Sequence, residues 1–121
     1  MPQLIECVPN FSEGRDLAVI KQITDAIETV EGAKLLDVDP GHATNRTVVT
    51  FVGPPEAAIE AAVAAARKAA ELIDMRRHTG EHPRFGAMDV CPLVPIADIT
   101  MDQTVEYARK LAQRQIGRAH V

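Results

Sequence analysis

Aromatic residues are scarce in this sequence, which has no tryptophan, one tyrosine and three phenylalanines among its 121 residues. Basic residues are not in excess either: 13 Lys and Arg stand against 17 Asp and Glu, for a formal net charge of -4. Nucleic-acid binding draws on a basic face, and single-strand binding also draws on stacking aromatics. We therefore expect no nucleic-acid partner.

Long apolar runs are also missing, and none approaches the roughly 20 residues of a membrane-spanning helix. The N-terminus, Met1-Pro2-Gln3, lacks the basic start of a signal peptide. Only two cysteines are present, Cys7 and Cys91, and they match neither a disulfide framework nor a paired zinc clip. We expect a cytoplasmic protein with no membrane partner and with both cysteines reduced, on or near the core.

The composition is that of one globular domain, with 46% hydrophobic and 25% charged residues. Periodicity and turn residues predict strands over residues 4–8, 33–39, 47–52 and 88–96, and helices that begin near Asp16, Pro55 and Thr100. This order, βαββαβ followed by a helix, predicts an α+β sandwich of the ferredoxin-like, split βαβ type. A doubly wound sheet would need a helix between the second and third strands, where residues 39–46 are too few.

Apolar residues at helical spacing predict the buried stripes of the first two helices. For the first helix they are Leu17, Ile20, Ile23, Ile27 and Val30, and for the second Ile59, Val63, Ala66, Ala70 and Ile73. The alanine-rich stretch 57–70 indicates a helix with a thin side-chain layer that packs closely against a sheet.

Unusual polar residues gather in three segments, residues 10–14, 37–46 and 76–84, each next to the end of an expected strand. Loops at strand ends commonly carry function. The third segment contains Arg76, Arg77 and Arg84, with only Glu81 opposing them. Such a local positive charge favours an anionic small molecule as the ligand.

His82 is the candidate proton carrier of the third segment, because an imidazole can accept and return a proton near neutral pH. His78, Glu81 and His82 also fit the H-x-x-E-H zinc pattern, which leaves a zinc hydrolase as an alternative. Gly80 and Pro83 disfavour the helix that this pattern needs, and no third ligand stands at an obvious spacing. We therefore expect no metal.

Polar residues around the turn after the second strand form another candidate group. We assign Asp37 and Asp39 to opposite faces of that strand and prefer Asp39 for a site, because it adjoins the turn. Asn45 and Arg46 follow the turn and are suited either to bind a carboxylate or to hold the loop.

Five motifs occur in order along the chain. They are Cys7-Val8-Pro9-Asn10-Phe11-Ser12-Glu13-Gly14, Leu36-Asp37-Val38-Asp39, Thr44-Asn45-Arg46-Thr47-Val48, Gly80-Glu81-His82-Pro83-Arg84 and Gly86-Ala87-Met88-Asp89-Val90-Cys91-Pro92. Together they closely resemble the N-terminal lobe of the glutamate formimidoyltransferases, the formiminotransferase part of the formiminotransferase-cyclodeaminase family. The resemblance runs from Met1 to about Arg114.

The resemblance implies transfer of a formimino group from N-formimidoyl-L-glutamate to tetrahydrofolate, in histidine degradation and one-carbon metabolism. Tetrahydrofolate is then a co-substrate, no metal is required, and formyl rather than formimino transfer is the alternative chemistry. The resemblance also implies a longer parent protein with two ferredoxin-like lobes, which forms a homodimer.

Individual roles follow from the same motifs. The family's catalytic base falls on His82, which would act as general base and then as general acid, and Asp39 is its expected helper. The expected substrate-binding residues are Asn10, His42, Asn45, Arg46 and Arg84.

Residues 116–121 depart from the family pattern and would be encoded by ATCGGAAGAGCACACGTC, part of a common sequencing adapter. We therefore expect residues 1–115 to be a truncated N-terminal lobe, inactive alone, and residues 116–121 to be a non-native tail. Different codons at that position would contradict this interpretation. A second reading of the whole chain stays open: a non-catalytic ferredoxin-like binding or assembly module that dimerises through its sheet edge.

Overall fold

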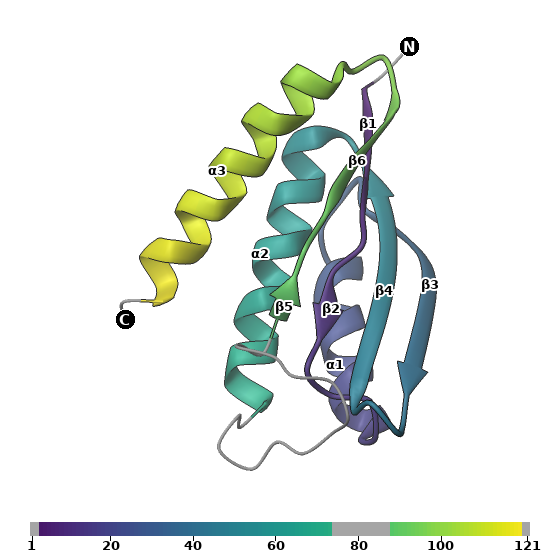
Figure 1. Ribbon diagram of the computed structural model, residues 1–121. Helices are drawn as coiled ribbons and strands as arrows, with labels where there is room; N and C mark the ends of the chain where they lie inside the picture. Colours follow the sequence, from purple (N-terminus) through teal and green to yellow (C-terminus); the bar gives the residue numbers. More distant parts are fainter. Residues whose placement is uncertain (1–2, 74–87, 120–121) are drawn as a thin grey trace.

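A computed structural model describes residues 3–73 and 88–119 of the chain. These residues form an antiparallel sheet with helices packed on one face (Figure 1). The strands are β1 (Leu4–Cys7), β2 (Asn10–Phe11), β3 (Lys34–Gly41), β4 (Arg46–Gly53), β5 (Met88–Val90) and β6 (Leu93–Ala97). The helices are α1 (Leu17–Glu28), α2 (Pro55–Leu72) and α3 (Met101–Ala119).

The sheet is built around β4, which pairs with β3 on one side and with both β1 and β2 on the other. In turn, β6 pairs with β1, and β5 pairs with β2. All of these pairings are antiparallel. Strands β1 and β2 are therefore two successive segments of one interrupted strand, and β5 and β6 are two successive segments of another. The result is an α+β architecture consistent with a ferredoxin-like fold.

The sequence predicted the break of the strand 88–96 at Pro92, whereas it ended the first strand at Pro9 and did not predict that the sheet continues beyond it. Each break contains a proline, Pro9 or Pro92, which has no N–H to donate to a neighbouring strand. The breaks lie side by side, because Val8 N donates to Pro92 O at 3.1 Å. Val49 N donates to Pro9 O at 3.0 Å, so β4 bridges the first break. As a consequence Asn10–Phe11, which the sequence placed in a loop, pairs in the sheet as β2.

Helix α1 begins at the predicted residue. The Oδ1 atom of Asp16 accepts hydrogen bonds from the N–H groups of Ala18 at 3.0 Å and Val19 at 3.3 Å, as an N-cap should. Ile20, Ile23 and Ile27 of the predicted stripe are buried. Leu17 is not: it is the first residue of the helix and is 66% exposed.

Helix α2 confirms the close packing that its alanines predicted, although its buried face is wider than the predicted stripe. Ile59 and Val63 are buried as expected, whereas Ala70 is exposed. The other buried positions are Pro55, Ala58, Ala61, Ala62, Ala65 and Ala69. The face is wide because α2 packs against the sheet, α1 and α3 together. Among the described helices, none combines the length and the apolar character that a bilayer crossing requires.

Helix α3 begins with the predicted capping box. Gln103 N donates to Thr100 Oγ1 at 3.1 Å, and Thr100 N donates to Gln103 Oε1 at 3.0 Å. Leu111 contributes to the same buried cluster as Ile59 of α2, and Arg114 reaches Glu60 at 2.6 Å. The helix is therefore attached to the body by an apolar contact and an ion pair.

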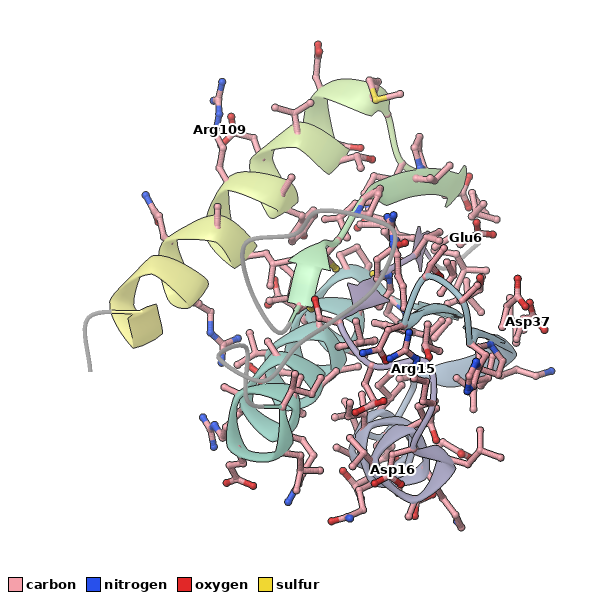
Figure 2. The ribbon with its side chains drawn as sticks, turned by 60° about the horizontal axis from the view of Figure 1, so that its bottom comes forward. Glu6, Arg15, Asp16, Asp37 and Arg109 are labelled. Atoms are coloured by element: carbon pink, nitrogen blue, oxygen red, sulfur yellow. The ribbon has the colours of Figure 1, made fainter. Side chains whose placement is uncertain are left out.

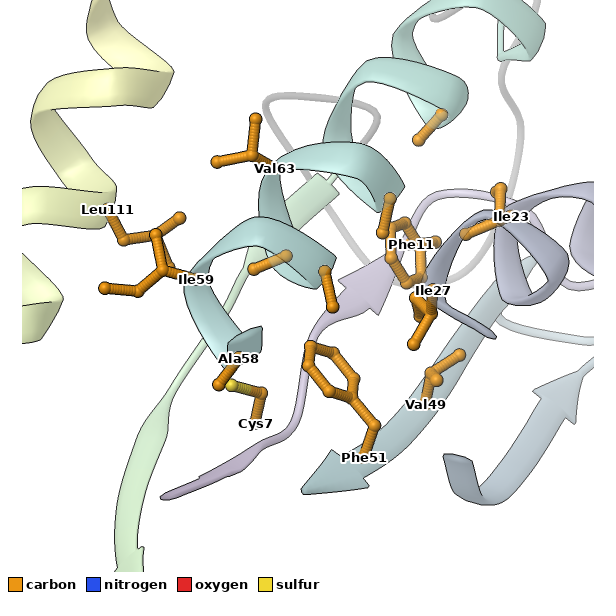
Figure 3. Packing of buried hydrophobic residues seen from close by; sticks show 14 of the residues in the cluster. Cys7, Phe11, Ile23, Ile27, Val49, Phe51, Ala58, Ile59, Val63 and Leu111 are labelled. Carbon is orange, nitrogen blue, oxygen red and sulfur yellow. The ribbon is translucent and has the colours of Figure 1, made fainter. Parts of the chain in front are cut away.

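The core lies between the helices and one face of the sheet (Figure 3). Phe11, Val49 and Phe51 supply its sheet side, and Ile23 and Ile27 of α1 meet them from above the sheet. Cys7 also belongs to this cluster, and Cys91 packs against it, as predicted for both cysteines.

The opposite face of the sheet is uncovered by the helices of the described residues (Figure 1). Along β4, Thr47, Val49 and Phe51 are buried, whereas Arg46 and Val48, which point to the other face, are only half-buried. We call this second face the open face. Polar residues on the open face and in the loops at one end of the sheet, described next, form the candidate site.

Asp37 and Asp39 both belong to the open face, so their assignment to opposite faces was wrong. Asp37 is paired with Thr50 and Asp39 with Val48, two residues that point to the same side of β4. The physical reason is the two-residue repeat of a strand, which places alternate side chains on one face. Both carboxylates are exposed.

Candidate functional site

A cluster of buried polar residues lies at one end of the sheet. In the described part of the chain, four of the six buried polar residues are found there, namely Asn10, Ser12, Asn45 and Thr47. They come from β2, the loop that follows it, the β3–β4 turn and the first residues of β4. Buried polar groups require hydrogen-bond partners. The concentration of four such residues here therefore indicates that the loops at this end of the sheet are held together by hydrogen bonds.

Asn45 joins two loops that are distant in sequence. Its Oδ1 atom accepts a hydrogen bond from the N–H of Gly14 at 2.9 Å, across 31 residues of chain. Its backbone has a φ of +52°, a left-handed conformation that asparagine tolerates better than most residues. Asn45 N donates to His42 O at 3.2 Å, which closes the β3–β4 turn. The structure thus shows a loop-holding role for Asn45; substrate binding by its side chain stays a prediction.

Gly14 is required by the same junction. A Cβ atom at this position would lie 2.2 Å from Gly41 O and 2.4 Å from Arg46 N, closer than any side chain can approach. The loop is held on its other side by Thr47, whose hydroxyl donates to Glu13 O. The loop after β2 therefore lies directly against the backbone that presents Arg46.

Arg46 is held in place by Asn10. The Nε atom of Arg46 donates to Asn10 Oδ1 at 2.9 Å, and Asn10 Nδ2 donates to Val8 O at 3.1 Å. Asn10 is 7% exposed, while the Arg46 side chain is half-buried. A guanidinium fixed in this way is suited to bind a carboxylate or another anion.

Asp39 lies in the same row of the open face. It is paired with Val48 from one side, and Asn10 is paired with Val48 from the other. Because neighbouring strands are about 4.8 Å apart, the backbones of Asp39 and Asn10 are separated by about 10 Å. A half-buried arginine, Arg46, and an exposed carboxylate, Asp39, thus share one end of the open face.

His42 lies at the tip of the β3–β4 turn and is exposed. Its backbone oxygen accepts the hydrogen bond from Arg15 Nε at 2.8 Å. In Figure 2, Arg15 and Asp16 mark the start of α1, and Asp37 marks strand β3. The structure shows the backbone of His42 engaged in the turn, and a substrate contact by its side chain stays a prediction.

The remaining predicted site residues lie outside the described residues. They are His82 and Arg84, together with Arg76, Arg77, His78 and Glu81 of the same segment. The chain rejoins the sheet at Met88, six residues after His82, where β5 pairs with β2. Val90 is paired with Asn10 and Met88 with Phe11, so β5 begins at the end of the sheet that carries Arg46.

Metal binding finds no support in the described part of the chain, where no group of three or more His, Cys, Asp or Glu could hold an ion. Burial raises the pKa of the Cys7 thiol well above its ordinary range, with smaller effects from Cys91 and Glu6. Burial likewise raises the pKa of Cys91 to about 12. Both side chains are therefore protonated near neutral pH and behave as core residues.

Sequence reasoning missed the residues that hold the site together. It mentioned Gly14 and Glu13 only as loop residues and counted Thr47 only as a strand former. In Glu13, the Oε2 atom accepts hydrogen bonds from the N–H groups of Arg15 and Asp16, both at 3.0 Å. For Thr47 a signal was available in the sequence: it is a polar residue at a strand position that the pattern predicts to be buried, and a buried polar group needs a hydrogen-bond partner.

Comparison with known proteins identifies the family. Residues 4–121 match the model of the formiminotransferase domain, N-terminal subdomain. The chain is 57% identical over 114 residues to formimidoyltransferase-cyclodeaminase of Rattus norvegicus, a match that covers 94% of this chain and 21% of the relative. It is 58% identical over 114 residues to the protein of the same name from Gallus gallus, again covering 94% of this chain and 21% of the relative.

A shorter relative is glutamate formimidoyltransferase of Thermoplasma acidophilum, which is 54% identical over 113 residues, covering 92% of this chain and 37% of the relative. The chain therefore spans between about a fifth and two fifths of the length of these relatives. The family resemblance carried by the motifs is confirmed, and the chain belongs to the formiminotransferase domain family, as its N-terminal subdomain.

Proposed function

We propose that this chain forms the N-terminal lobe of a transferase that moves a formimino group from N-formimidoyl-L-glutamate to tetrahydrofolate. The observation that carries the proposal is the Arg46–Asn10 pair on the open face, in one row with Asp39. These residues come from three separate motifs of the family pattern. The names of the relatives add support, since they are formimidoyltransferases.

The complete activity belongs to a longer polypeptide with two ferredoxin-like lobes. The chain corresponds to 21% of the Rattus norvegicus relative and 37% of the Thermoplasma acidophilum relative, so most of each relative lies outside the match. We expect the rest of the binding site to come from that longer polypeptide. The isolated chain is accordingly expected to be inactive.

The reaction requires proton transfer between two nitrogens. The N5 amine of tetrahydrofolate attacks the formimino carbon, and a C–N bond forms to give a tetrahedral intermediate. The bond to the glutamate nitrogen then breaks, and glutamate leaves as an amine. One proton is lost by N5 and one is gained by the leaving nitrogen. A single imidazole can do both, and we assign this role to His82 with Asp39 as its helper.

Carboxylate recognition is the role of the arginines. Both substrates carry glutamate carboxylates, and an arginine binds a carboxylate through two parallel hydrogen bonds. Arg46 is held by Asn10 and so loses little side-chain freedom on binding. Arg84 is the second candidate, and His42 and Asn45 complete the set. The chemistry calls for no metal, and a formyl group could be transferred by the same residues.

The test is transfer of the formimino group to tetrahydrofolate by the longer polypeptide that contains this chain. We expect His82→Ala to reduce kcat by well over tenfold, a cost above about 1.4 kcal/mol in transition-state stabilisation, while the protein stays folded. We expect Arg46→Leu to raise KM. Arg67→Leu, at an exposed arginine of α2, is the matched control and should leave both parameters unchanged.

Two outcomes would contradict the proposal. A folded longer polypeptide without transfer activity would favour the non-catalytic binding or assembly module. Full activity in His82→Ala would remove the assigned base while leaving the family intact.

A further inference from the structure

Glu6 is a carboxylate on the open face, with a strand on either side of it. Its neighbours in β1, Ile5 and Cys7, are buried in the core, so Glu6 points to the other side of the sheet. It is paired with Val52 of β4 and with Val94 of β6. Glu6 and Val52 are half-buried, and Val94 is 40% exposed. The carboxylate therefore stands between two apolar side chains.

The side chain of Glu6 has no hydrogen bond or ion pair with any of the described residues. Other glutamates of the same chain are engaged: Glu13 accepts two backbone N–H groups, and Glu60 forms an ion pair with Arg114. Partial burial between apolar groups removes some of the water that solvates a carboxylate, and hydrogen-bond donors compensate for that loss. A ligand on the open face that supplies such donors would therefore be bound at Glu6.

We propose that Glu6 binds the pyrimidine edge of the tetrahydrofolate pteridine, with Val52 and Val94 against the ring. This edge carries a 2-amino group and an N3–H, two parallel donors that match the two oxygens of a carboxylate. The ring is uncharged, so its face can lie on valine side chains without the desolvation of a charge. The inference rests on the proposed function, because it takes tetrahydrofolate as the co-substrate.

Spacing along β4 assigns Glu6 to this second substrate rather than to the formimino donor. Arg46 and Val52 are six residues apart in the strand, about 20 Å at the usual rise per residue. N-formimidoyl-L-glutamate is too short to reach from Arg46 to the row of Glu6, whereas the donor and a pteridine laid end to end span it. Val48, the partner of Asp39, lies between these two positions. The formimino carbon and N5 would then meet near Asp39, the assigned helper.

The experiment is equilibrium binding to the longer polypeptide that contains this chain, by titration calorimetry under nitrogen. The two probes are tetrahydrofolate and its 2-desamino analogue, which lacks one of the two donors. We expect the parent protein to bind the analogue about tenfold more weakly. We expect Glu6→Gln to bind tetrahydrofolate more weakly by a similar factor and to lose the preference for the 2-amino group. Glu28→Gln, at an exposed glutamate of α1, is the matched control and should change neither affinity.

The stability of this chain separates recognition from a structural role. Since no described residue bonds to the carboxylate, Glu6→Gln should leave the urea midpoint unchanged or raise it. A lower midpoint would show that Glu6 supports the fold, and this would overturn the inference.

Two binding results would also overturn it. Equal affinity of the parent protein for the two probes would do so without any variant, and so would a preference for the 2-amino group that survives in Glu6→Gln. The proposed function fails differently: formimino transfer without this preference would overturn the inference alone, whereas the preference without transfer would overturn the proposed function alone.

Discussion

The two faces of the sheet are built from the same strands but are held by different forces. On the helix-covered face, Val49 and Phe51 of β4 are fully buried among apolar side chains. On the open face, Arg46 of the same strand is held by a hydrogen bond to Asn10. The two-residue repeat of a strand makes this division possible, because one strand can stabilise the fold with one set of side chains and carry chemistry with the other.

Phe51→Ala is expected to give the largest loss of stability, because it removes a fully buried aromatic ring at the centre of the core. Removal of such a ring typically lowers the free energy of unfolding by about 4 kcal/mol. Urea denaturation checks this value. Val48→Ala on the same strand is the control, since Val48 is half-buried on the open face and should cost much less. Equal losses in the two variants would show that the open face is packed as tightly as the core.

Gly14→Ala should come next, because the added methyl group meets backbone rather than a movable side chain. Its Cβ would lie 2.2 Å from Gly41 O, so the loop after β2 must move away from the β3–β4 turn. Overpacking of this kind costs about 3 kcal/mol. Gly41→Ala is an informative comparison, because its nearest neighbour is the hydroxyl of Thr44, which can rotate. A Gly14→Ala variant as stable as the parent chain would contradict the observed junction.

Asn45→Ala should have a smaller effect, of about 2 kcal/mol in the free energy of unfolding. It leaves the buried N–H of Gly14 without its acceptor and places an alanine at a φ of +52°. Asn45→Gly separates these two causes, because glycine accepts this φ freely but also lacks the acceptor. We expect Asn45→Gly to recover part of the loss. If it recovered all of it, the hydrogen bond to Gly14 would contribute nothing.

The sequence predicted the helix-covered face better than the open face. Apolar spacing predicted Ile20, Ile23 and Ile27 correctly, because burial of a helix face is a regular, local pattern. The effect of the prolines on strand pairing was harder to predict. Pro9 and Pro92 each interrupt a strand, yet the sheet continues across both breaks because Val8, next to Pro9 in the chain, donates to Pro92 itself. That compensation joins segments distant in sequence, so no local pattern could show it.

Only the residue types of the candidate site could be predicted, because its arrangement also depends on contacts between segments distant in sequence. The types of the residues at Asn10, Asp39 and Arg46 marked them as polar groups near strand ends, and their family motifs supplied the roles. Their mutual arrangement depends on strand register, because Asn10 and Asp39 flank Val48 only through two separate pairings. The contact between Asn45 and Gly14 likewise spans 31 residues. Neither relation can be deduced from spacing along the chain.

Asp39→Asn should have the smallest effect on stability and is the sharpest test of the division between the two faces. Asp39 is an exposed residue of β3, and exposed substitutions usually change the free energy of unfolding by less than about 0.5 kcal/mol. Asparagine keeps the size of the side chain and removes its charge.

If the open face contributes to the reaction, Asp39→Asn should lower kcat of formimino transfer in the longer polypeptide while the urea midpoint of this chain stays unchanged. Asp37→Asn is the matched control, because Asp37 shares the strand, the face and the exposure of Asp39 but lies two residues farther from the Arg46 end. Equal losses of activity in both variants would indicate a general effect of negative charge on this face, and no loss in either would leave Asp39 as a solvent-exposed surface residue without a part in the reaction.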